Sequence, residues 1–120
     1  MEALPADLRR KRTAYVAELE EAVNRLVAVL SAMPEVERVI LFGSYARGRR
    51  DLFTDLDVLV LMRTELGFLE RTKYLYRMLD LPVDADILCY LPEEFERLKE
   101  RPFLRRALQE GIVVYEKEPA

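Results

Sequence analysis

The sequence predicts one α/β or α+β domain, in which a sheet of three to four strands is covered by helices. Length and composition support a single core, because the 120 residues are 51% hydrophobic and 34% charged. Apolar segments with helical spacing also alternate with short runs rich in Val, Ile and Leu, which is typical of helices alternating with strands. We therefore expect residues 1–120 to form one domain.

The elements can be placed in order from periodicity and from breaking residues. Proline and glycine mark most of their ends, and an uninterrupted apolar run predicts a central strand that is covered on both faces. The expected elements are helix 5–33, strand 36–42, short helix 45–50, central strand 56–62, helix 65–79, strand 83–90, helix 93–99, helix 102–110 and strand 112–115.

Local signals give further detail at three helices. Thr64 is expected to cap the helix over 65–79, and Gly111 the C-terminal end of the helix over 102–110. In the helix over 65–79, the residues expected to face inward are Phe68, Leu69, Leu75, Tyr76 and Leu79. The N-terminal helix is long, and its apolar stripe extends to Leu4, Leu8 and Tyr15. This surplus predicts an interface with a partner or a second copy.

Residue usage excludes several kinds of chemistry. The chain has no histidine, which removes Ser-His triads and imidazole-based zinc sites. Any metal must be held by oxygen, which favours magnesium, manganese or calcium. The only cysteine, Cys89, cannot form an internal disulfide, so we expect a reducing cytoplasm. No apolar run is long enough to span a membrane, and the N-terminus lacks the order of a signal peptide.

The charge pattern bears on possible partners. A net charge of −3 argues against broad nucleic-acid binding. The basic residues are nevertheless clustered, at residues 9–12, at Arg47, Arg49 and Arg50, and at Arg101, Arg105 and Arg106. We interpret the first and last clusters as solvated helix faces. The middle cluster differs, because it adjoins a candidate phosphate site.

Two carboxylates begin the central strand. Asp55 and Asp57 are two positions apart, so on a strand they project to the same side, roughly 6–7 Å apart along the chain. Carboxylates held side by side repel unless a cation lies between them. Oxygen ligands on a rigid strand suit Mg²⁺, whose other positions are filled by water and phosphate. The alternative is an acidic surface turn without a metal.

A Gly-Ser pair precedes the short helix. Gly43 lets a ligand approach the backbone closely, and Ser44 offers a hydroxyl and unpaired N–H groups to phosphate. Arg47, one turn later, can reach phosphate oxygens with its planar fork. The alternative is a strand-to-helix turn in which Gly and Ser serve only the backbone.

A third acid is available on the next strand. Asp84 and Asp86 again stand two positions apart. Asp84 is nearer the loop, and we interpret it as solvated. Asp86 precedes an apolar run, and an unpaired carboxylate inside a buried strand would be costly. We therefore favour Asp86 as the third carboxylate of a two-metal site.

These residues carry a resemblance to a known family. Gly43-Ser44, ten intervening residues and Asp55-x-Asp57 resemble the signature of the DNA polymerase β-like nucleotidyltransferase superfamily. The longer strings 41–48 and 55–60 look like its minimal nucleotidyltransferase (MNT) branch, the MntA-type antitoxins of HEPN/MNT pairs. The resemblance covers residues 36–116. Thr54 stands where many relatives have Ser, which preserves the hydroxyl.

The resemblance implies a fold, a site and a reaction. It implies a polymerase β-like palm with a mixed sheet, with Asp55, Asp57 and Asp86 as ligands of two Mg²⁺ ions, or Mn²⁺. It also implies that Asp86 activates the acceptor hydroxyl and that Gly43 and Ser44 hold the triphosphate of ATP. Members of this branch pair with a helical HEPN-domain toxin and adenylylate one of its tyrosines. The length agrees, since no residues remain for an acceptor-binding domain.

Three functions therefore stand open. The first is Mg²⁺-dependent transfer of AMP from ATP to a hydroxyl of a HEPN-domain partner. The second keeps the enzyme and changes the acceptor to a small molecule or an RNA 3′ end. The third is an antitoxin that neutralises its partner by binding alone. The set of acidic residues favours an enzyme over the third.

Overall fold

The structure, a computed structural model, describes residues 4–119. Its elements follow the predicted order and confirm the predicted fold class, a mixed α/β arrangement. They are α1 (Ala6–Ser31), β1 (Val36–Phe42), α2 (Gly43–Ala46), β2 (Leu56–Met62), α3 (Phe68–Leu79), β3 (Ala85–Tyr90), α4 (Pro92–Leu98), α5 (Pro102–Glu110) and β4 (Ile112–Glu116).

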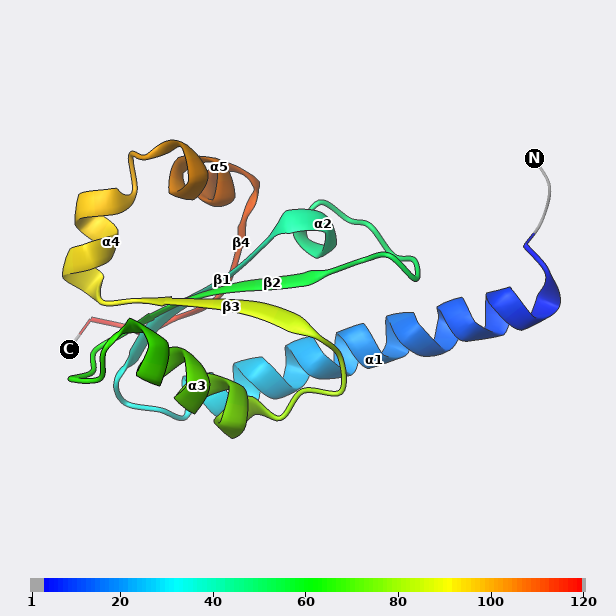
Figure 1. The fold of residues 1–120 in the computed structure, drawn as a ribbon, viewed down its shortest axis with the longest axis horizontal. Helices are drawn as coiled ribbons and strands as arrows, with labels where there is room; N and C mark the ends of the chain where they lie inside the picture. The colour runs from blue at the N-terminus through cyan, green and yellow to red at the C-terminus, as the bar shows by residue number, and fades with distance from the viewer. Residues whose placement is uncertain (1–3, 120) are drawn as a thin grey trace.

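The four strands form one mixed sheet in the order β3-β2-β1-β4. β2 and β3 run parallel, whereas β1 pairs antiparallel with both β2 and β4. β2 lies inside the sheet and almost all of its residues are buried, as its uninterrupted apolar run predicted. Helices α1 and α3 cover one face of the sheet, and α4 and α5 cover the other (Figure 1).

The sheet separates two apolar cores, and alternation along β2 supplies both. Val58 and Val60 point into the larger core with α1 and α3, while Leu59 and Leu61 point into the smaller one under α4 and α5. Cys89 is buried in the larger core, and burial raises the pKa of its thiol to about 11. It is therefore a packing residue that stays protonated.

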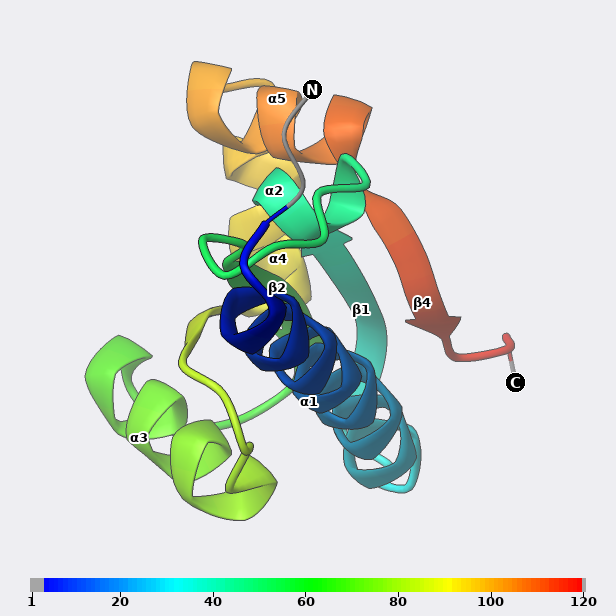
Figure 2. The same ribbon diagram turned by 90° about the vertical axis from the view of Figure 1, so that its right-hand side faces the viewer.

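The N-terminal part of α1 extends beyond the sheet. The buried residues of this helix begin only at Leu19, and the molecule reaches 50 Å in its longest dimension. Figures 1 and 2 show α1 passing beneath the sheet and its first turns projecting past the end of the strands. Leu4 is 48% exposed and Tyr15 is half-buried. Leu4 is therefore exposed as the predicted surplus requires, whereas Tyr15 packs against the larger core and does not extend the stripe beyond it.

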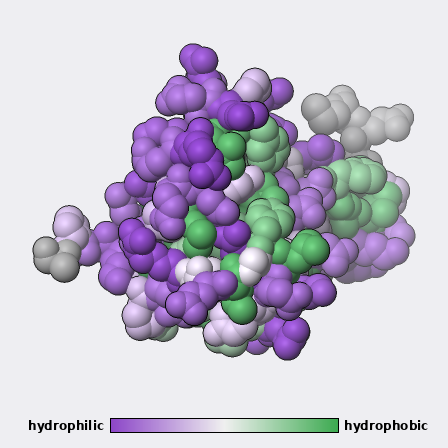
Figure 3. All heavy atoms as spheres, turned by 60° about the vertical axis from the view of Figure 1, so that its left-hand side comes forward, coloured by the Kyte–Doolittle hydropathy of each residue, from purple (hydrophilic) through white to green (hydrophobic). Residues whose placement is uncertain are grey.

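Helix α3 differs from its prediction in its start and in its inward face. It begins at Phe68, and the Thr64 hydroxyl accepts a hydrogen bond from the Leu66 N–H in the turn before it (3.1 Å). Phe68, Leu69 and Tyr76 are exposed, whereas the buried residues are Arg71, Leu75 and Leu79. Arg71 faces inward because an ion pair with Glu94 of α4 neutralises it. Figure 3 shows apolar side chains interrupting the charged surface on the side of α3 and α4.

Smaller differences occur at the other ends. The short helix spans Gly43–Ala46 instead of 45–50, and β3 begins two residues later than predicted. Gly111 follows α5 with an extended backbone, φ −75°, so it is no left-handed cap. Its role is spatial, because a Cβ there would lie 2.6 Å from the Ala107 carbonyl oxygen. Within residues 4–119, no helix has the length and hydropathy needed to cross a membrane.

Candidate active site

Three segments that are distant in sequence meet at one end of the sheet. β1 ends at Phe42, which is paired with Asp57 near the start of β2. Asp57 is in turn paired with Asp86 in the parallel register of β2 and β3. The Gly-Ser turn and two of the predicted acidic residues therefore lie together, although more than forty residues separate Gly43 from Asp86 in the chain.

Gly43 is required by its conformation and by its neighbour. Its φ is +73°, which L side chains rarely adopt. A Cβ at this position would also overlap the Oδ2 atom of Asp57. The carboxylate of Asp57 therefore lies directly against the Gly43 backbone. The sequence analysis expected a ligand to approach the backbone here, and that approach stays a prediction; the contact in the structure is with an acidic side chain of the same protein.

Ser44 acts within the protein and not only at its surface. Its side chain is almost buried, at 8% exposed. The hydroxyl accepts a hydrogen bond from the Asp55 N–H (2.9 Å) and approaches the Asp55 carbonyl oxygen as donor (3.3 Å). Ser44 thus fastens the backbone that carries Asp55 to the turn after β1. The sequence reading assigned this hydroxyl to phosphate and missed the internal contact.

The three predicted carboxylates differ in their surroundings. Asp55 precedes β2 and is exposed, and Asp86 is exposed as well, whereas Asp57 is half-buried. The pKa of the Asp57 carboxyl is raised, mainly by burial and then by the charges of Asp86 and Asp55 and a hydrogen bond with Asp86. Arg47 opposes this shift. A neighbouring cation would therefore favour the charged form of Asp57.

Exposure of Asp86 corrects one premise of the sequence analysis. We expected Asp86 to be buried, but β3 is an edge strand, and Asp86 lies near its N-terminal end and is exposed. Its carboxylate can therefore meet a second molecule. Asp84 lies before β3, and its charge acts on Tyr15 of α1. The structure thus pairs Asp86, and not Asp84, with Asp57.

The acidic residues suit a divalent cation, but they do not form a complete metal centre in this structure. Within the described part of the chain, no three acidic or thiol side chains gather as a formed metal centre. Asp57 and Asp86 do lie side by side, with Asp55 close enough to shift the pKa of Asp57. Carboxylate oxygens are the donors that Mg²⁺ prefers. The residues fit the metal, and the full set of ligands stays a prediction.

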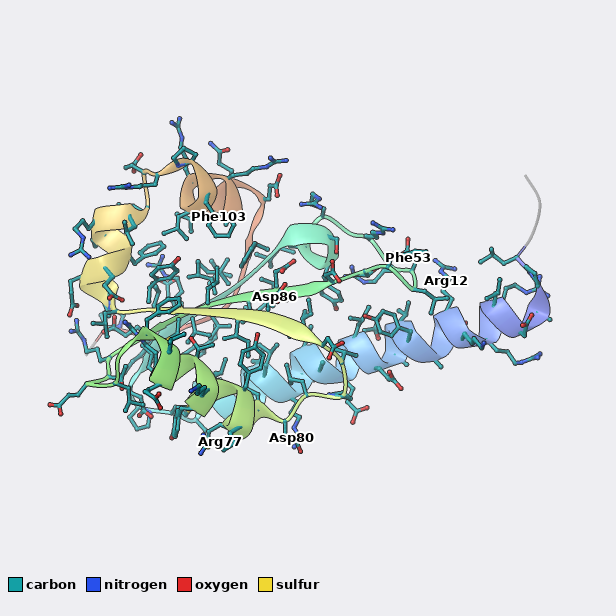
Figure 4. All side chains as sticks on the ribbon, in the orientation of Figure 1. Arg12, Phe53, Arg77, Asp80, Asp86 and Phe103 are labelled. Carbon is teal, nitrogen blue, oxygen red and sulfur yellow. The ribbon has the colours of Figure 1, made fainter. Side chains whose placement is uncertain are left out.

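Arg47 leads to residues that the sequence analysis missed. Its Nη1 lies 3.0 Å from the Glu110 carboxylate of α5, which also binds Arg106 at 3.2 Å. These three side chains line a cavity of about 250 Å³ together with Phe42, Gly43, Phe103 and Ala107. Phe103 comes from the side of α5 that faces the sheet and packs edge-on against Phe42 (Figure 4). Arg106 is 78% exposed, as the interpretation of a solvated helix face requires, but no sequence signal places α5 beside Gly43.

The remaining arginines of the motif are held by the loop itself. Arg49 forms an ion pair with Asp51 at 2.9 Å. Arg50 stacks over the Tyr45 ring, 3.5 Å from its centroid, and donates to the Tyr45 carbonyl oxygen. Of the middle basic cluster, Arg47 is therefore the member that faces the cavity beside Gly43.

Comparison with known proteins bears on the fold and the family. Residues 24–120 match the family model "Polymerase beta, Nucleotidyltransferase". A protein named protein adenylyltransferase MJ1379, from Methanocaldococcus jannaschii, is 24% identical over 103 residues, which cover 82% of this chain and 95% of that protein.

Two solved structures share the fold. A nucleotidyltransferase from Sulfolobus solfataricus aligns with a TM-score of 0.55 and 18% identity, covering 98% of this chain and 94% of that one. A mutant of the toxin–antitoxin MntA-HpeT aligns with a TM-score of 0.51 and 22% identity, covering 82% and 73%. Both alignments extend over most of the described sheet and helices.

Proposed function

Because the chain belongs to the polymerase β nucleotidyltransferase family, we propose that it transfers AMP from ATP to a tyrosine hydroxyl of a HEPN-domain toxin and so acts as an antitoxin. The observation that carries this proposal is the pairing of Asp57 with Asp86 beside Gly43. The relative named protein adenylyltransferase supports a protein acceptor. The likeness to a toxin–antitoxin structure supports this kind of partner.

The reaction exchanges a phosphoanhydride bond of ATP for a phosphoester bond to the acceptor. The acceptor oxygen forms a bond to the α-phosphorus of ATP, the bond to the bridging oxygen breaks, and pyrophosphate leaves. The hydroxyl proton passes to Asp86, which is exposed and can therefore reach a bound acceptor. Asp57, half-buried against Gly43, is held more rigidly and serves binding.

A divalent metal fits this acidic cluster. Asp55, Asp57 and Asp86 would hold two Mg²⁺ ions, and Mn²⁺ satisfies the same oxygen donors. When bound, the metal neutralises the triphosphate and makes the attacking hydroxyl more acidic. Ser44 contributes indirectly, because its hydroxyl fixes the Asp55 backbone.

The triphosphate would lie along the Gly43 turn. Gly43 has no side chain to keep phosphate from the backbone, and Arg47 borders the adjoining cavity. Arg47 would exchange Glu110 for a phosphate oxygen, while Arg106 remains as the partner of Glu110. This exchange leaves no buried charge unpaired, because the Arg47–Glu110 pair is exposed.

The test is transfer of label from α-³²P-ATP to a HEPN-domain protein added as the proposed partner. Wild type with Mg²⁺ should label that protein, and Asp57→Asn should lower the rate by at least about 100-fold, because the metal loses a ligand. Asp84→Asn is the matched control, since Asp84 is exposed and unpaired with Asp57, and it should retain the rate.

The same experiment separates the alternatives. Labelling that survives Asp57→Asn would overturn the assigned site. If the Asp55→Ala/Asp57→Ala variant transfers no label but still neutralises the toxin, the protein is an antitoxin that acts by binding. Label that appears on RNA 3′ ends or on a small hydroxylated molecule, with the partner protein unlabelled, would show a different acceptor.

A further inference from the structure

The backbone on both sides of Asp86 is held by a tyrosine from α3. The Tyr76 hydroxyl donates a hydrogen bond to the Ala85 carbonyl oxygen (2.6 Å) and accepts one from the Ile87 N–H (3.0 Å). These two groups flank Asp86 directly. β3 is the edge strand beyond β2, so groups on its outer side have no neighbouring strand. The Tyr76 hydroxyl makes the two hydrogen bonds that a further strand would otherwise make with these groups.

A second tyrosine holds the backbone before Asp55. The Tyr15 hydroxyl, on α1, donates to the Thr54 carbonyl oxygen at 2.9 Å. The pKa of Tyr15 is raised by burial and by the charges of Asp55, Asp84 and Glu18, which keeps the hydroxyl protonated as a donor. Ser44 holds the other side of the same peptide, through the Asp55 N–H. The peptide that precedes Asp55 is thus held at both its oxygen and its nitrogen.

Both tyrosines approach from the face of the sheet opposite the α5 cavity. They belong to α1 and α3, which cover the face away from α4 and α5 (Figure 1). Their hydrogen-bond partners are the backbone groups of Thr54, Ala85 and Ile87, and these bonds leave the carboxylates of Asp55 and Asp86 free. Their effect on the acidic residues is therefore one of position.

We propose that Tyr76 and Tyr15 are positioning residues that fix Asp86 and Asp55 for metal binding and transfer, a role that rests on the function proposed above. Asp55 and Asp86 are exposed and lack the packing that holds Asp57. An edge strand and a loop end would otherwise let both carboxylates shift relative to Asp57. Two hydroxyls remove that freedom without occupying any oxygen that a metal or a substrate needs.

The test removes only the hydroxyls. Tyr76→Phe and Tyr15→Phe keep the ring, and Tyr74→Phe is the matched control, because within residues 4–119 the Tyr74 hydroxyl forms no hydrogen bond although it lies on the same helix. Binding of Mn²⁺ in the presence of a non-hydrolysable ATP analogue is followed by electron paramagnetic resonance. The Mg²⁺ dependence of AMP transfer and the melting temperature are measured alongside.

Tyr76→Phe should weaken Mn²⁺ binding and raise the Mg²⁺ concentration for half-maximal rate by roughly 10-fold, as is typical when an outer partner of a metal ligand is lost. Tyr15→Phe should also weaken Mn²⁺ binding and raise the Mg²⁺ concentration for half-maximal rate. Excess Mg²⁺ should restore much of the rate of both variants. A role in stability alone would lower the melting temperature and leave the Mg²⁺ dependence unchanged. That result, or equal behaviour of Tyr76→Phe and Tyr74→Phe, overturns the proposal.

Two further variants keep this test separate from the proposed function. If Asp57→Asn and Asp86→Asn lose transfer while Tyr76→Phe and Tyr15→Phe match the control, the site stands and the positioning role is wrong. If Asp57→Asn and Asp86→Asn retain transfer and Mn²⁺ binding, the site itself is wrong. In that case any change in the Mg²⁺ dependence of Tyr76→Phe would have another cause, and the positioning role would be wrong as well.

Discussion

At the scale of single residues, Gly43 is constrained both by a positive φ and by a close neighbour, whereas Gly48 is constrained by its φ alone. Both have a positive φ, +73° and +98° respectively. A Cβ at Gly43 would overlap Asp57, whereas nothing lies within 4 Å of a Cβ at Gly48. Comparing alanine at the two positions therefore isolates the contribution of the carboxylate contact from that of the backbone conformation.

We expect Gly48→Ala to lower the free energy of unfolding by about 1 kcal/mol and to retain transfer. Gly43→Ala should lower it by about 3 kcal/mol, since overpacking adds to the same backbone strain. It should also reduce transfer about 100-fold, because Asp57 must move. Urea unfolding and initial rates check both. Equal effects of the two substitutions would show that Asp57 can move away from a Cβ at position 43 without loss of stability or of transfer.

The predictability of the site also depends on single residues. Asp57 could be placed from sequence, because strand alternation fixes the side to which it points. The Ser44 contact could not, because a hydroxyl fits phosphate and backbone equally well, and only the fold brings the Asp55 N–H to it. The exposure of Asp86 was missed because an apolar run does not show whether its strand lies at the edge of a sheet.

At the scale of elements, α3 shows where periodicity reaches its limit. Leu75 and Leu79 were predicted correctly, but Phe68 and Leu69 were assigned to the core by hydrophobicity alone. The true third member of the stripe is Arg71, four residues before Leu75. A charged residue is accepted there only because Glu94 of α4 meets it, and that pairing over 23 positions has no local signal.

This ion pair yields the second prediction. Arg71 donates to both carboxylate oxygens of Glu94, at 2.8 and 3.1 Å, and Glu94 also accepts from the Leu91 N–H at the start of α4. Glu94→Gln should therefore lower the free energy of unfolding at pH 7 by about 2 kcal/mol, through loss of a charge-assisted pair to a buried arginine. Glu93→Gln is the control and should change it by less than about 0.5 kcal/mol, because Glu93 is exposed.

The pH dependence has a defined sign. Hydrogen bonds from Arg71 hold the pKa of Glu94 below its ordinary value, so its stabilising contribution is complete above the unfolded pKa of about 4.3. The contribution is lost as the pH falls through the lower, folded pKa. The difference between wild type and Glu94→Gln should therefore shrink between pH 7 and pH 3. A difference that is constant over this range would show that charge is not its source.

At the scale of the whole molecule, order and topology were predictable, but the use of surfaces was not. The order of strands and helices follows from breaks and periodicity, and the resemblance gave the mixed sheet. The position of α5 beside Gly43 depends on packing between residues far apart, including Phe103 on Phe42. Among residues 4–119, Phe53 is the most exposed large apolar side chain, at 76%, and it gave no sequence signal.

Phe53 gives the last prediction, because it stands two residues before Asp55 on the loop above α1. Figure 4 shows it near Arg12, whose Nε donates to the Arg50 carbonyl oxygen at 2.9 Å. This loop tip and the projecting part of α1 offer apolar surface beside the site. We expect a partner that presents a tyrosine to Asp55 to contact this loop, because Phe53 stands two residues before Asp55. Buried aromatic residues commonly dominate such contacts.

Phe53→Ser should therefore weaken binding of the HEPN-domain protein about 10-fold, equivalent to roughly 1.4 kcal/mol, and raise the KM for that acceptor with little change in kcat. The melting temperature should hold, since Phe53 contributes little to the core. Leu69→Ser is the matched control, because Leu69 is 68% exposed on α3 and should leave binding unchanged. Calorimetry measures the affinity, and light scattering measures the mass of the chain alone. A wild-type dimer that Phe53→Ser converts to a monomer would assign this surface to a second copy of the chain instead.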